Sequence, residues 1–248
     1  MNLKRHLPYI MKLDMNSQPN ISFAITACNE HKELDRLLKQ IIPIVKENDE
    51  IVIQVDTGNC TPEVSDVITK YAGKVTMCGF PLNGHFANFK NNLKANCTKD
   101  YIFQIDADEE LGSFLLLAHD LLAENPNQDL FVLSRINTVK NIDPDYVKSQ
   151  GWNVDYKHTY NGEPIINWPD LQLRLFKNIK SIKWSGKVHE KLVGYKSYTI
   201  VGTADVSDID ANRKFSLIHE KTFTRQIAQN NFYKKLIEDG DNTNHTVI

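Results

Sequence analysis

Apolar and polar residues alternate in blocks through the first 111 residues of the chain. Short runs of β-branched and aromatic residues predict four buried strands, and the segments between them place apolar residues at helical spacing. This order of strands and helices predicts a parallel sheet with right-handed crossovers, and therefore an α/β fold. The strands are expected at 21–27, 50–56, 74–80 and 101–110, with helices within 28–45, around 64–71 and within 85–97.

The second part of the chain has a less regular pattern. An amphipathic helix is expected over 113–125 and a strand over 129–137. The polar stretch 138–167 contains scattered aromatic residues, which indicates a lid or an acceptor loop, with disorder as the competing interpretation. Two short strands are expected at 171–178 and 181–192, and an apolar strand at 215–218 leads into a last helix.

Polar residues collect where the strands of the first part end. In a parallel sheet these carboxyl ends meet along one edge, where open α/β folds bind their ligands. Neither G-x-G-x-x-G nor a Walker A sequence follows the first strand, which disfavours dinucleotide-binding and P-loop enzymes. The polar residues are Thr26, Asn29 and Glu30 after the first strand, Asp56 and Thr57 after the second, and Asp106 and Asp108 after the fourth.

The fourth strand ends in the acidic sequence DADEE, which begins at Asp106. Carboxylates this close repel one another unless a cation lies among them. Asp106 and Asp108, separated by the small Ala107, suit a hard cation such as Mg²⁺ or Mn²⁺ that carries a diphosphate. A solvated acidic turn that caps a following helix is the alternative.

Composition limits the class of protein further. Of the 248 residues 41% are hydrophobic and 24% charged, which is typical of a globular protein, and the net charge of −2 gives no global signal for nucleic acid. No apolar run approaches the ~18 residues of a membrane span. We expect a cytoplasmic protein without an integral membrane segment. Its expected parts are an N-terminal extension (1–20), one domain (21–240, with halves 21–111 and 112–240) and a polar tail (241–248).

The four cysteines lie far apart and form no CxxC pair. They are expected to be buried free thiols in a reducing compartment, without a structural zinc.

The ordered combination of ITACNE, VDTGNCTPE, FPLNGHFANFKNN and FQIDADEEL resembles the nucleotide-sugar-binding half of a family 2 glycosyltransferase. The resemblance implies the GT-A fold, a Rossmann-like and mostly parallel central sheet flanked by helices, with a C-terminal acceptor-side extension. It also implies metal-dependent transfer of a sugar, with inversion, from a nucleotide diphosphate sugar to an acceptor hydroxyl. A UDP-sugar is the favoured donor.

The resemblance assigns roles to single residues. Asp56 is expected to meet the base, Lys90 to lie near the base or the phosphates, and Asp106 to lie against the ribose or the metal. Asp108 is expected to bind the Mn²⁺ or Mg²⁺ ion that holds the diphosphate. Without the family, Asp56 suits a simple turn and Lys90 a solvated helix face. The other residues expected to line the nucleotide site are Thr26, Ala27, Asn29, Glu30 and Ala107.

A second match to the family is WSGKVHE at 184–190, which follows an arginine-bearing strand. The segments 171–178 and 181–192 resemble the family's acceptor-side hairpin, which implies that they pair with each other. The resemblance implies that Glu190 is the general base that takes the proton from the acceptor hydroxyl. Arg174, Trp184 and His189 would then lie on the acceptor side. An exposed polar pair is the alternative for His189 and Glu190. The sequence lacks the second histidine of H-E-x-x-H, so zinc-peptidase chemistry is not supported.

His219 follows the apolar run FSLI. Many GT-A enzymes complete the metal shell with a late histidine, and neutral imidazole suits Mn²⁺. A hydrogen-bonded structural histidine is the equally weighted alternative. Arg225 and Gln226, in the following helix, could reach the diphosphate, but they are expected on the helix surface.

Several acceptors remain open: a lipid-linked glycan, a surface polysaccharide, a protein side chain or a hydroxymethylated DNA base. Nucleic acid is considered only as an acceptor. A nucleotidyltransferase is one alternative function, but ITACNEHKE lacks its glycine-rich, arginine-containing loop. A non-catalytic sugar-nucleotide-binding protein is another, and it would need no Glu190. A basic patch that would suit a DNA acceptor is expected from Lys177, Lys180, Lys183, Lys187 and Lys191.

Overall fold

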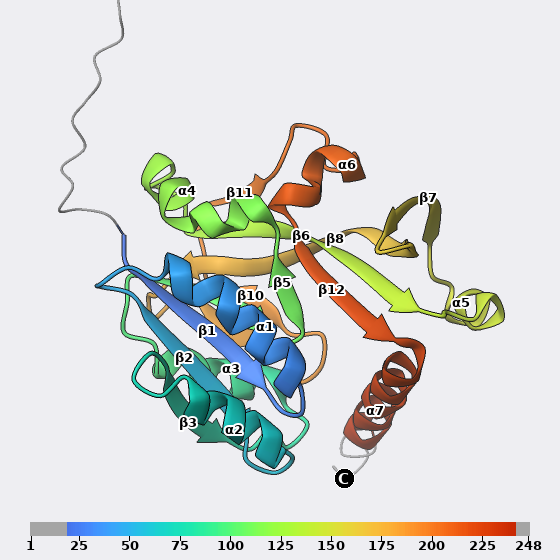
Figure 1. Cartoon of the computed structure of the whole chain (residues 1–248), viewed down its shortest axis with the longest axis horizontal. Helices are drawn as coiled ribbons and strands as arrows, with labels where there is room; N and C mark the ends of the chain where they lie inside the picture. Colours follow the sequence, from blue (N-terminus) through green and yellow to red (C-terminus); the bar gives the residue numbers. More distant parts are fainter. Residues whose placement is uncertain (1–18, 242–248) are drawn as a thin grey trace, which may run out of the picture.

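A ten-stranded mixed sheet runs through the protein, whose computed structural model describes residues 19–241 (Figure 1). The strands lie in the order β3-β2-β1-β4-β8-β6-β12-β5, with β7 added to β8 and β11 added to β6. The expected N-terminal extension and polar tail lie almost wholly outside the described residues.

The first part of the chain forms the parallel side of this sheet. β1 pairs in parallel with both β2 and β4, and β2 pairs in parallel with β3. The predicted α/β order is therefore confirmed. The elements are β1 (Ile21–Ala27), α1 (His31–Ile41), β2 (Glu50–Asp56), α2 (Pro62–Lys70), β3 (Thr76–Phe80), α3 (Phe86–Ala95) and β4 (Tyr101–Asp106).

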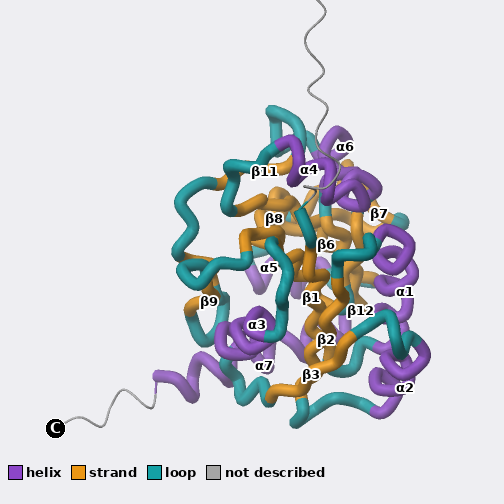
Figure 2. Tube along the Cα trace, turned by 90° about the vertical axis from the view of Figure 1, so that its left-hand side faces the viewer, coloured by secondary structure: helices purple, strands orange, loops and turns teal. Residues whose placement is uncertain are grey.

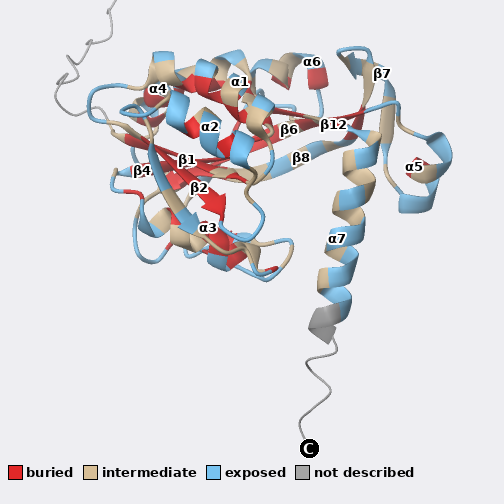
Figure 3. Cartoon of the chain, turned by 60° about the horizontal axis from the view of Figure 1, so that its bottom comes forward, coloured by how far each residue is buried: buried red, intermediate tan, exposed pale blue. Residues whose placement is uncertain are grey.

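The rest of the chain builds the other side of the sheet. β8 (Glu163–Lys177) runs antiparallel between β4 and β6 (Leu130–Lys140), and β12 (Leu217–Thr222) pairs in parallel with β6. α7 (Phe223–Asp241) leaves the end of β12 and extends away from the sheet (Figure 3). The remaining elements are β5 (Glu109–Leu111), α4 (Ala118–Glu124), α5 (Pro144–Gln150), β7 (Val154–Tyr160), β9 (Lys183–Ser185), β10 (Lys191–Val193), β11 (Tyr198–Val201), α6 (Ile209–Asn212) and 3₁₀ turns at Ile42–Ile44, Ser113–Leu117 and Arg213–Phe215.

Both faces of the sheet are covered, and successive residues of β1 enter different cores. Phe23 packs in the core under α1, α2 and α4, whereas Ala24 packs in the core under α3 and β9. Figure 2 shows α1 and α2 on one side of the strands and α3 on the other. A fully buried phenylalanine such as Phe23 contributes about 1.5–3 kcal/mol relative to an exposed one. This two-sided burial explains why the strands lack an alternating pattern.

The polar stretch 138–167 is not a loop. It contains the end of β6, the helix α5, the strand β7 and the start of β8. The expectation of a loop is therefore wrong. Among the described strands β7 pairs with β8 alone, and it is buried on neither face, so its sequence shows no alternation of apolar and polar residues. The helix α5 has ordinary boundaries. The Asp143 side chain caps its start, and Gly151, with φ 64°, follows its end.

The expected pairing between 171–178 and 181–192 is also wrong. Residues 171–177 belong to β8 in the main sheet, whereas β9 pairs with β10. Leu175 and Phe176 are both buried, on opposite faces of β8, so this strand is central and not part of a surface hairpin.

Candidate active site

A cleft of about 970 Å³ opens at the carboxyl ends of β1, β2 and β4. Its other walls are the β9–β10 loop, parts of β6 and β8, and the first half of α7. A second hollow of about 500 Å³ beside α6 and β5 contains none of the expected site residues. The expected residues that line the cleft are Thr26, Ala27, Glu30, Asp56, Lys90, Asp106, Ala107, Asp108, Arg174, Trp184, His189, Glu190 and His219.

The buried guanidinium of Arg174 neutralises the carboxylates of Asp106 and Glu109 from inside the sheet. Its Nη2 donates to Asp106 Oδ2 at 2.8 Å and to Glu109 Oε1 at 2.7 Å. Arg135 Nη1 donates to the same Glu109 oxygen at 3.0 Å. Burial opposes the ionisation of Asp106, but Arg174 and Lys90 outweigh it and hold the pKa of Asp106 well below its ordinary value.

This arrangement corrects two expectations. Glu109 is fully buried in β5 and no helix begins at the acidic run, so the solvated, helix-capping turn is wrong. The positive charges beside Asp106 and Glu109 include the guanidinium groups of Arg174 and Arg135. Arg174, expected on the acceptor side, is a buried residue beneath Asp106 whose Nε and Nη1 have no partner among the described residues.

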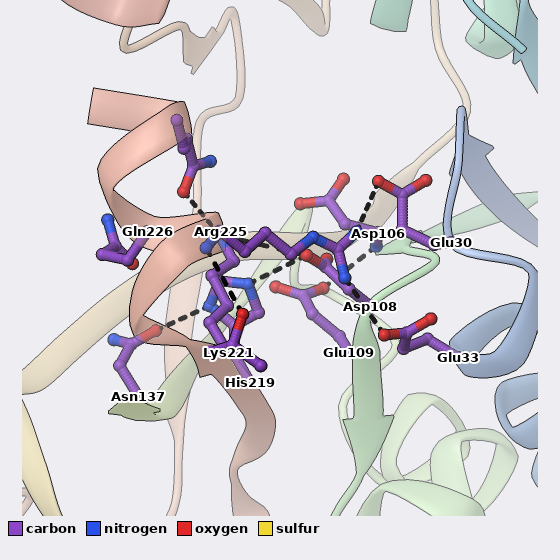
Figure 4. Close-up of polar contacts among 12 residues, drawn as sticks. Glu30, Glu33, Asp106, Asp108, Glu109, Asn137, His219, Lys221, Arg225 and Gln226 are labelled. Atoms are coloured by element: carbon purple, nitrogen blue, oxygen red, sulfur yellow. Dashed lines mark hydrogen bonds and ion pairs between the residues drawn. The ribbon is translucent and has the colours of Figure 1, made fainter. Parts of the chain in front are cut away.

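Asp108 and His219 meet at the next position along this edge (Figure 4). His219 Nε2 lies 3.2 Å from Asp108 Oδ2, and His219 Nδ1 lies 2.9 Å from Asn137 Oδ1. Burial lowers the pKa of His219, which favours the neutral ring at pH 7. A neutral ring that donates from Nδ1 to Asn137 turns the Nε2 lone pair towards a carboxylate.

His219 Nε2 and Asp108 Oδ2 are then two acceptors that face each other, and a cation bound between them would satisfy both. Imidazole and carboxylate are ligands that suit Mn²⁺. Within residues 19–241, no group of three or more His, Cys, Asp or Glu side chains is arranged to hold a metal. A nucleotide-bound divalent ion commonly takes only one or two protein ligands, with phosphate and water oxygens completing its shell. Asp108 and His219 therefore fit such an ion.

Glu190 and Lys90 form an ion pair inside the cleft. Glu190 Oε1 lies 2.7 Å from Lys90 Nζ, and the Lys90 side chain is only 9% exposed. Lys90 Nζ also lies 3.8 Å from Asp106 Oδ1 and 4.7 Å from the centroid of the Trp184 ring. The solvated helix face is therefore wrong for Lys90, because β9 and the β9–β10 loop cover this side of α3.

The loop that carries Glu190 has an unusual backbone. Gly186 and His189 both have positive φ, at 106° and 55°. His189 is exposed, with its ring centroid 5.8 Å from that of Tyr233, whereas the Glu190 side chain is only 13% exposed. The exposed polar pair is therefore wrong for Glu190.

Arg225 joins the last helix to the loop after β1 (Figure 4). Its guanidinium contacts Glu30 Oε1 at 2.8 Å, Glu33 Oε1 at 3.0 Å and Asn29 Oδ1 at 3.4 Å. Arg225 is 29% exposed on α7, as expected for a helix-surface residue, but these contacts hold its side chain against the loop after β1. Asn29 itself is exposed and does not line the cleft.

Asp56 is a buried turn residue as well as a cleft residue. Its Oδ1 accepts from the backbone N–H groups of Gly58 and Leu82, both at 3.0 Å, and its Oδ2 accepts from Asn59 Nδ2 at 2.8 Å. The turn expected from the residues alone is present, and the carboxylate also borders the cleft.

Lys221 is a cleft residue that sequence reasoning missed. It is buried, donates from Nζ to Gln229 Oε1 at 2.6 Å, and lies 3.9 Å from Asp108 Oδ2. A usable signal existed, since Lys221 follows His219 by two positions and strand residues two apart share a face. Gln226 and Gln229, from α7, also line this wall.

The four cysteines are free thiols, as expected, but only Cys97 is buried. Of the expected lysine patch, Lys177 pairs with Asp129, and Lys187 donates to a backbone oxygen of α7. The part of the chain that the structure describes has no helix long and apolar enough to cross a membrane.

The family model described as "Glycosyl transferase family 2" matches residues 22–182. The crystal structure of S. aureus TarS is similar with a TM-score of 0.50 and 13% identity, over 81% of this chain and 36% of that chain. The crystal structure of S. aureus TarS 1-349 gives a TM-score of 0.49 and 12% identity, over 81% of this chain and 60% of that chain.

A structure of the same TarS segment in complex with UDP-GlcNAc gives a TM-score of 0.44 and 13% identity, over 76% of this chain and 61% of that chain. The chain thus spans about 60% of the length of these TarS segments. No match was found among curated proteins. The family match and the shared fold confirm the expected α/β architecture of GT-A type.

Proposed function

The chain belongs to glycosyl transferase family 2, and we propose that its cleft moves a sugar from a UDP-sugar to an acceptor hydroxyl with inversion of configuration. One observation carries this proposal. Glu190, from the β9–β10 loop, and the pair of Asp108 and His219, from the sheet edge, line the same cleft. A displacement at a sugar carbon needs both a base for the acceptor and a site for the departing diphosphate.

Glu190 is the residue we assign as the base. Lys90 Nζ forms an ion pair with its Oε1 atom at 2.7 Å, and no described residue donates a hydrogen bond to its Oε2 atom. Oε2 therefore receives the acceptor proton as the acceptor oxygen attacks the anomeric carbon and the bond to the diphosphate breaks. Lys90 holds the carboxylate in place during this step.

Asp108, His219 and Lys221 form the proposed diphosphate side. Asp108 and His219 would hold the divalent ion, Mn²⁺ or Mg²⁺, which when bound neutralises the diphosphate as a Lewis acid. Lys221 Nζ donates one hydrogen bond within the described part of the chain, to Gln229, and an ammonium group offers three donors. We assign its remaining donors to the phosphate oxygens of the leaving group.

The acceptor is proposed only as a hydroxyl compound. Lys183 and Lys191 lie on the exposed side of the β9–β10 pair and have no ion-pair partner among the described residues. This leaves an anionic acceptor, nucleic acid included, among those to test, together with neutral glycans and protein hydroxyls.

Donor hydrolysis tests the proposal without a known acceptor. Purified protein is incubated with UDP-GlcNAc, other UDP-sugars and GDP-sugars in the presence of Mn²⁺, and release of the nucleoside diphosphate is measured. We expect release from at least one UDP-sugar, and its loss in Asp108→Asn with an unchanged melting temperature for the metal-free protein. Donor binding that is insensitive to EDTA would remove the metal assignment.

Two outcomes favour the alternative functions. Binding of the UDP-sugar without any turnover, alone or with acceptor mixtures, indicates a non-catalytic binding protein. Formation of a nucleotide sugar from a nucleoside triphosphate and a sugar phosphate indicates a nucleotidyltransferase.

A further inference from the structure

The side chain of Asn137 has a single amide orientation that satisfies both of its neighbours. One end of the amide lies 2.8 Å from Asp170 Oδ2, and only the amide nitrogen can donate to a carboxylate. The amide oxygen therefore faces His219 Nδ1, 2.9 Å away. Because an amide oxygen only accepts, Nδ1 must carry a proton.

Asp170 is a firm anchor for this orientation. Its Oδ2 also meets Arg135 Nε at 2.9 Å and Nη2 at 2.8 Å, and its Oδ1 accepts from Gln172 Nε2 at 2.6 Å. Burial opposes its ionisation, but Arg135 outweighs burial and holds the pKa of Asp170 below its ordinary value. Asp170 is thus an ionised acceptor that cannot donate to the amide.

The three residues lie on three adjacent strands of the main sheet. Asp170 of β8 is opposite Arg135 in the register of β6, and Asn137 of β6 is opposite His219 of β12. A β-bulge between Arg135 and Asn137 interrupts the β6–β8 ladder, and the two ladders together bring the three side chains to one place on the sheet. A hydrogen-bonded chain on a sheet is held more firmly than one on a loop.

We propose that Asn137 is a positioning residue that, anchored by Asp170, holds His219 in the Nδ1–H form and keeps the Nε2 lone pair free for a divalent cation. This rests on the proposed function, which assigns the cation to His219 and Asp108. With the other tautomer, Nε2–H would donate to Asp108 Oδ2, 3.2 Å away, and both cation ligands would be occupied by each other. The group that accepts a hydrogen bond from the other ring nitrogen of a metal-binding histidine commonly sets its tautomer in this way.

The first test reads the tautomer directly in metal-free protein. Protein labelled with ¹⁵N-histidine is studied at pH 8.5 by long-range ¹H–¹⁵N correlation, and the His219 signal is identified by its loss in His219→Gln. We expect Nδ1–H in the wild type. In Asn137→Leu we expect Nε2–H, because Asp108 is then the remaining acceptor. An Nε2–H signal in the wild type overturns the proposal.

The second test measures Mn²⁺ affinity by electron paramagnetic resonance titration in the presence of UDP. Asn137→Leu should bind Mn²⁺ about 10–100-fold more weakly. Thr138→Val is the matched control, since Thr138 is the next residue of β6 and its buried hydroxyl has no partner among the described residues. Its Mn²⁺ affinity should stay at the wild-type value.

Asp170→Ala provides a second variant in case Asn137→Leu does not fold. It removes the carboxylate that fixes the Asn137 amide, so the amide is free to turn and Mn²⁺ binding should again weaken. Equal Mn²⁺ affinity in the wild type and in whichever variants fold overturns the positioning role. Absence of Mn²⁺ binding in the wild type itself overturns the metal assignment of the proposed function, and the positioning role with it.

Discussion

Two regions of the cleft contain an acidic residue paired with a cation, and they differ in what surrounds the pair. At the β4–β5 edge, Asp106 and Glu109 share Arg174, which is 2% exposed and lies inside the sheet. In the β9–β10 loop, Glu190 pairs with Lys90 at the cleft surface, next to backbone with positive φ. The buried cluster of Asp106, Glu109 and Arg174 is part of the structural framework, whereas Glu190 and Lys90 can contact a bound substrate. A change in the first region should therefore affect stability, and a change in the second should affect turnover.

Glu190→Gln should give the largest effect and should act on turnover alone. The amide keeps the size of the side chain but cannot take a proton, so transfer should fall about 10²–10⁴-fold. Donor affinity, Mn²⁺ affinity and the melting temperature should stay near the wild-type values. Turnover close to that of the wild type would contradict the assignment of Glu190 and would move the base to another group of the cleft.

Arg174→Met should give the opposite result. It leaves the Asp106 and Glu109 carboxylates without their shared buried cation, so the free energy of unfolding should fall by about 3–5 kcal/mol. Urea unfolding followed by circular dichroism measures this change. Arg174→Lys, which keeps the charge, is the control and should lose less. A stable Arg174→Met protein would contradict the framework role.

The free energy of unfolding at acid pH tests whether Asp106 is ionised and paired in the folded protein. The pKa of Asp106 is depressed in the folded protein, so its contribution is present above the unfolded value of ~3.9 and is lost as the pH falls below it. Asp106→Asn should be less stable than the wild type at pH 7. That difference should shrink below pH ~4, by at most about 1.4 kcal/mol per pH unit. A constant difference from pH 7 to pH 3 would argue against an ionised, paired Asp106.

His189→Gly should give the smallest effect. A non-glycine residue at φ 55° is strained, and glycine relieves the strain but adds freedom to the unfolded chain. We expect stability to rise by less than about 1 kcal/mol. His189→Ala removes the same ring without relieving the backbone and should not be stabilised. Equal melting temperatures for the two variants would show that the backbone of this loop is not strained.

The sequence predicted the parallel side of the fold well because each of its strands is a short, isolated apolar run. The strand ends Thr26, Asp56 and Asp106 followed directly from that order, and the structure brings them to one cleft. The antiparallel side was predicted less well. The segment 171–178 was expected as a short strand on the acceptor side, yet its Arg174 is buried against two carboxylates from β4 and β5.

Residue pairs distant in the chain were beyond sequence reasoning. Arg225 contacts Glu30 across 195 positions, and Asn137 contacts His219 across 82. Neither partner carries a local signal of the other, because only the register of β6 and β12 and the direction of α7 bring them together. Lys90 was placed in the site by family resemblance, while its position between Asp106 and Glu190 comes from the packing of β9 on α3.

The contact between Arg225 and Glu30 also has a consequence for synthesis on the ribosome. Chains emerge from their N-terminus, so the strands of the parallel side are available long before β12 and α7. Until residue 225 has left the exit tunnel, the loop after β1 lacks its arginine and Asp108 lacks His219. In a nascent chain, the proposed nucleotide site should therefore be complete only after β12 and the start of α7 have emerged, when most of the sheet can already have formed.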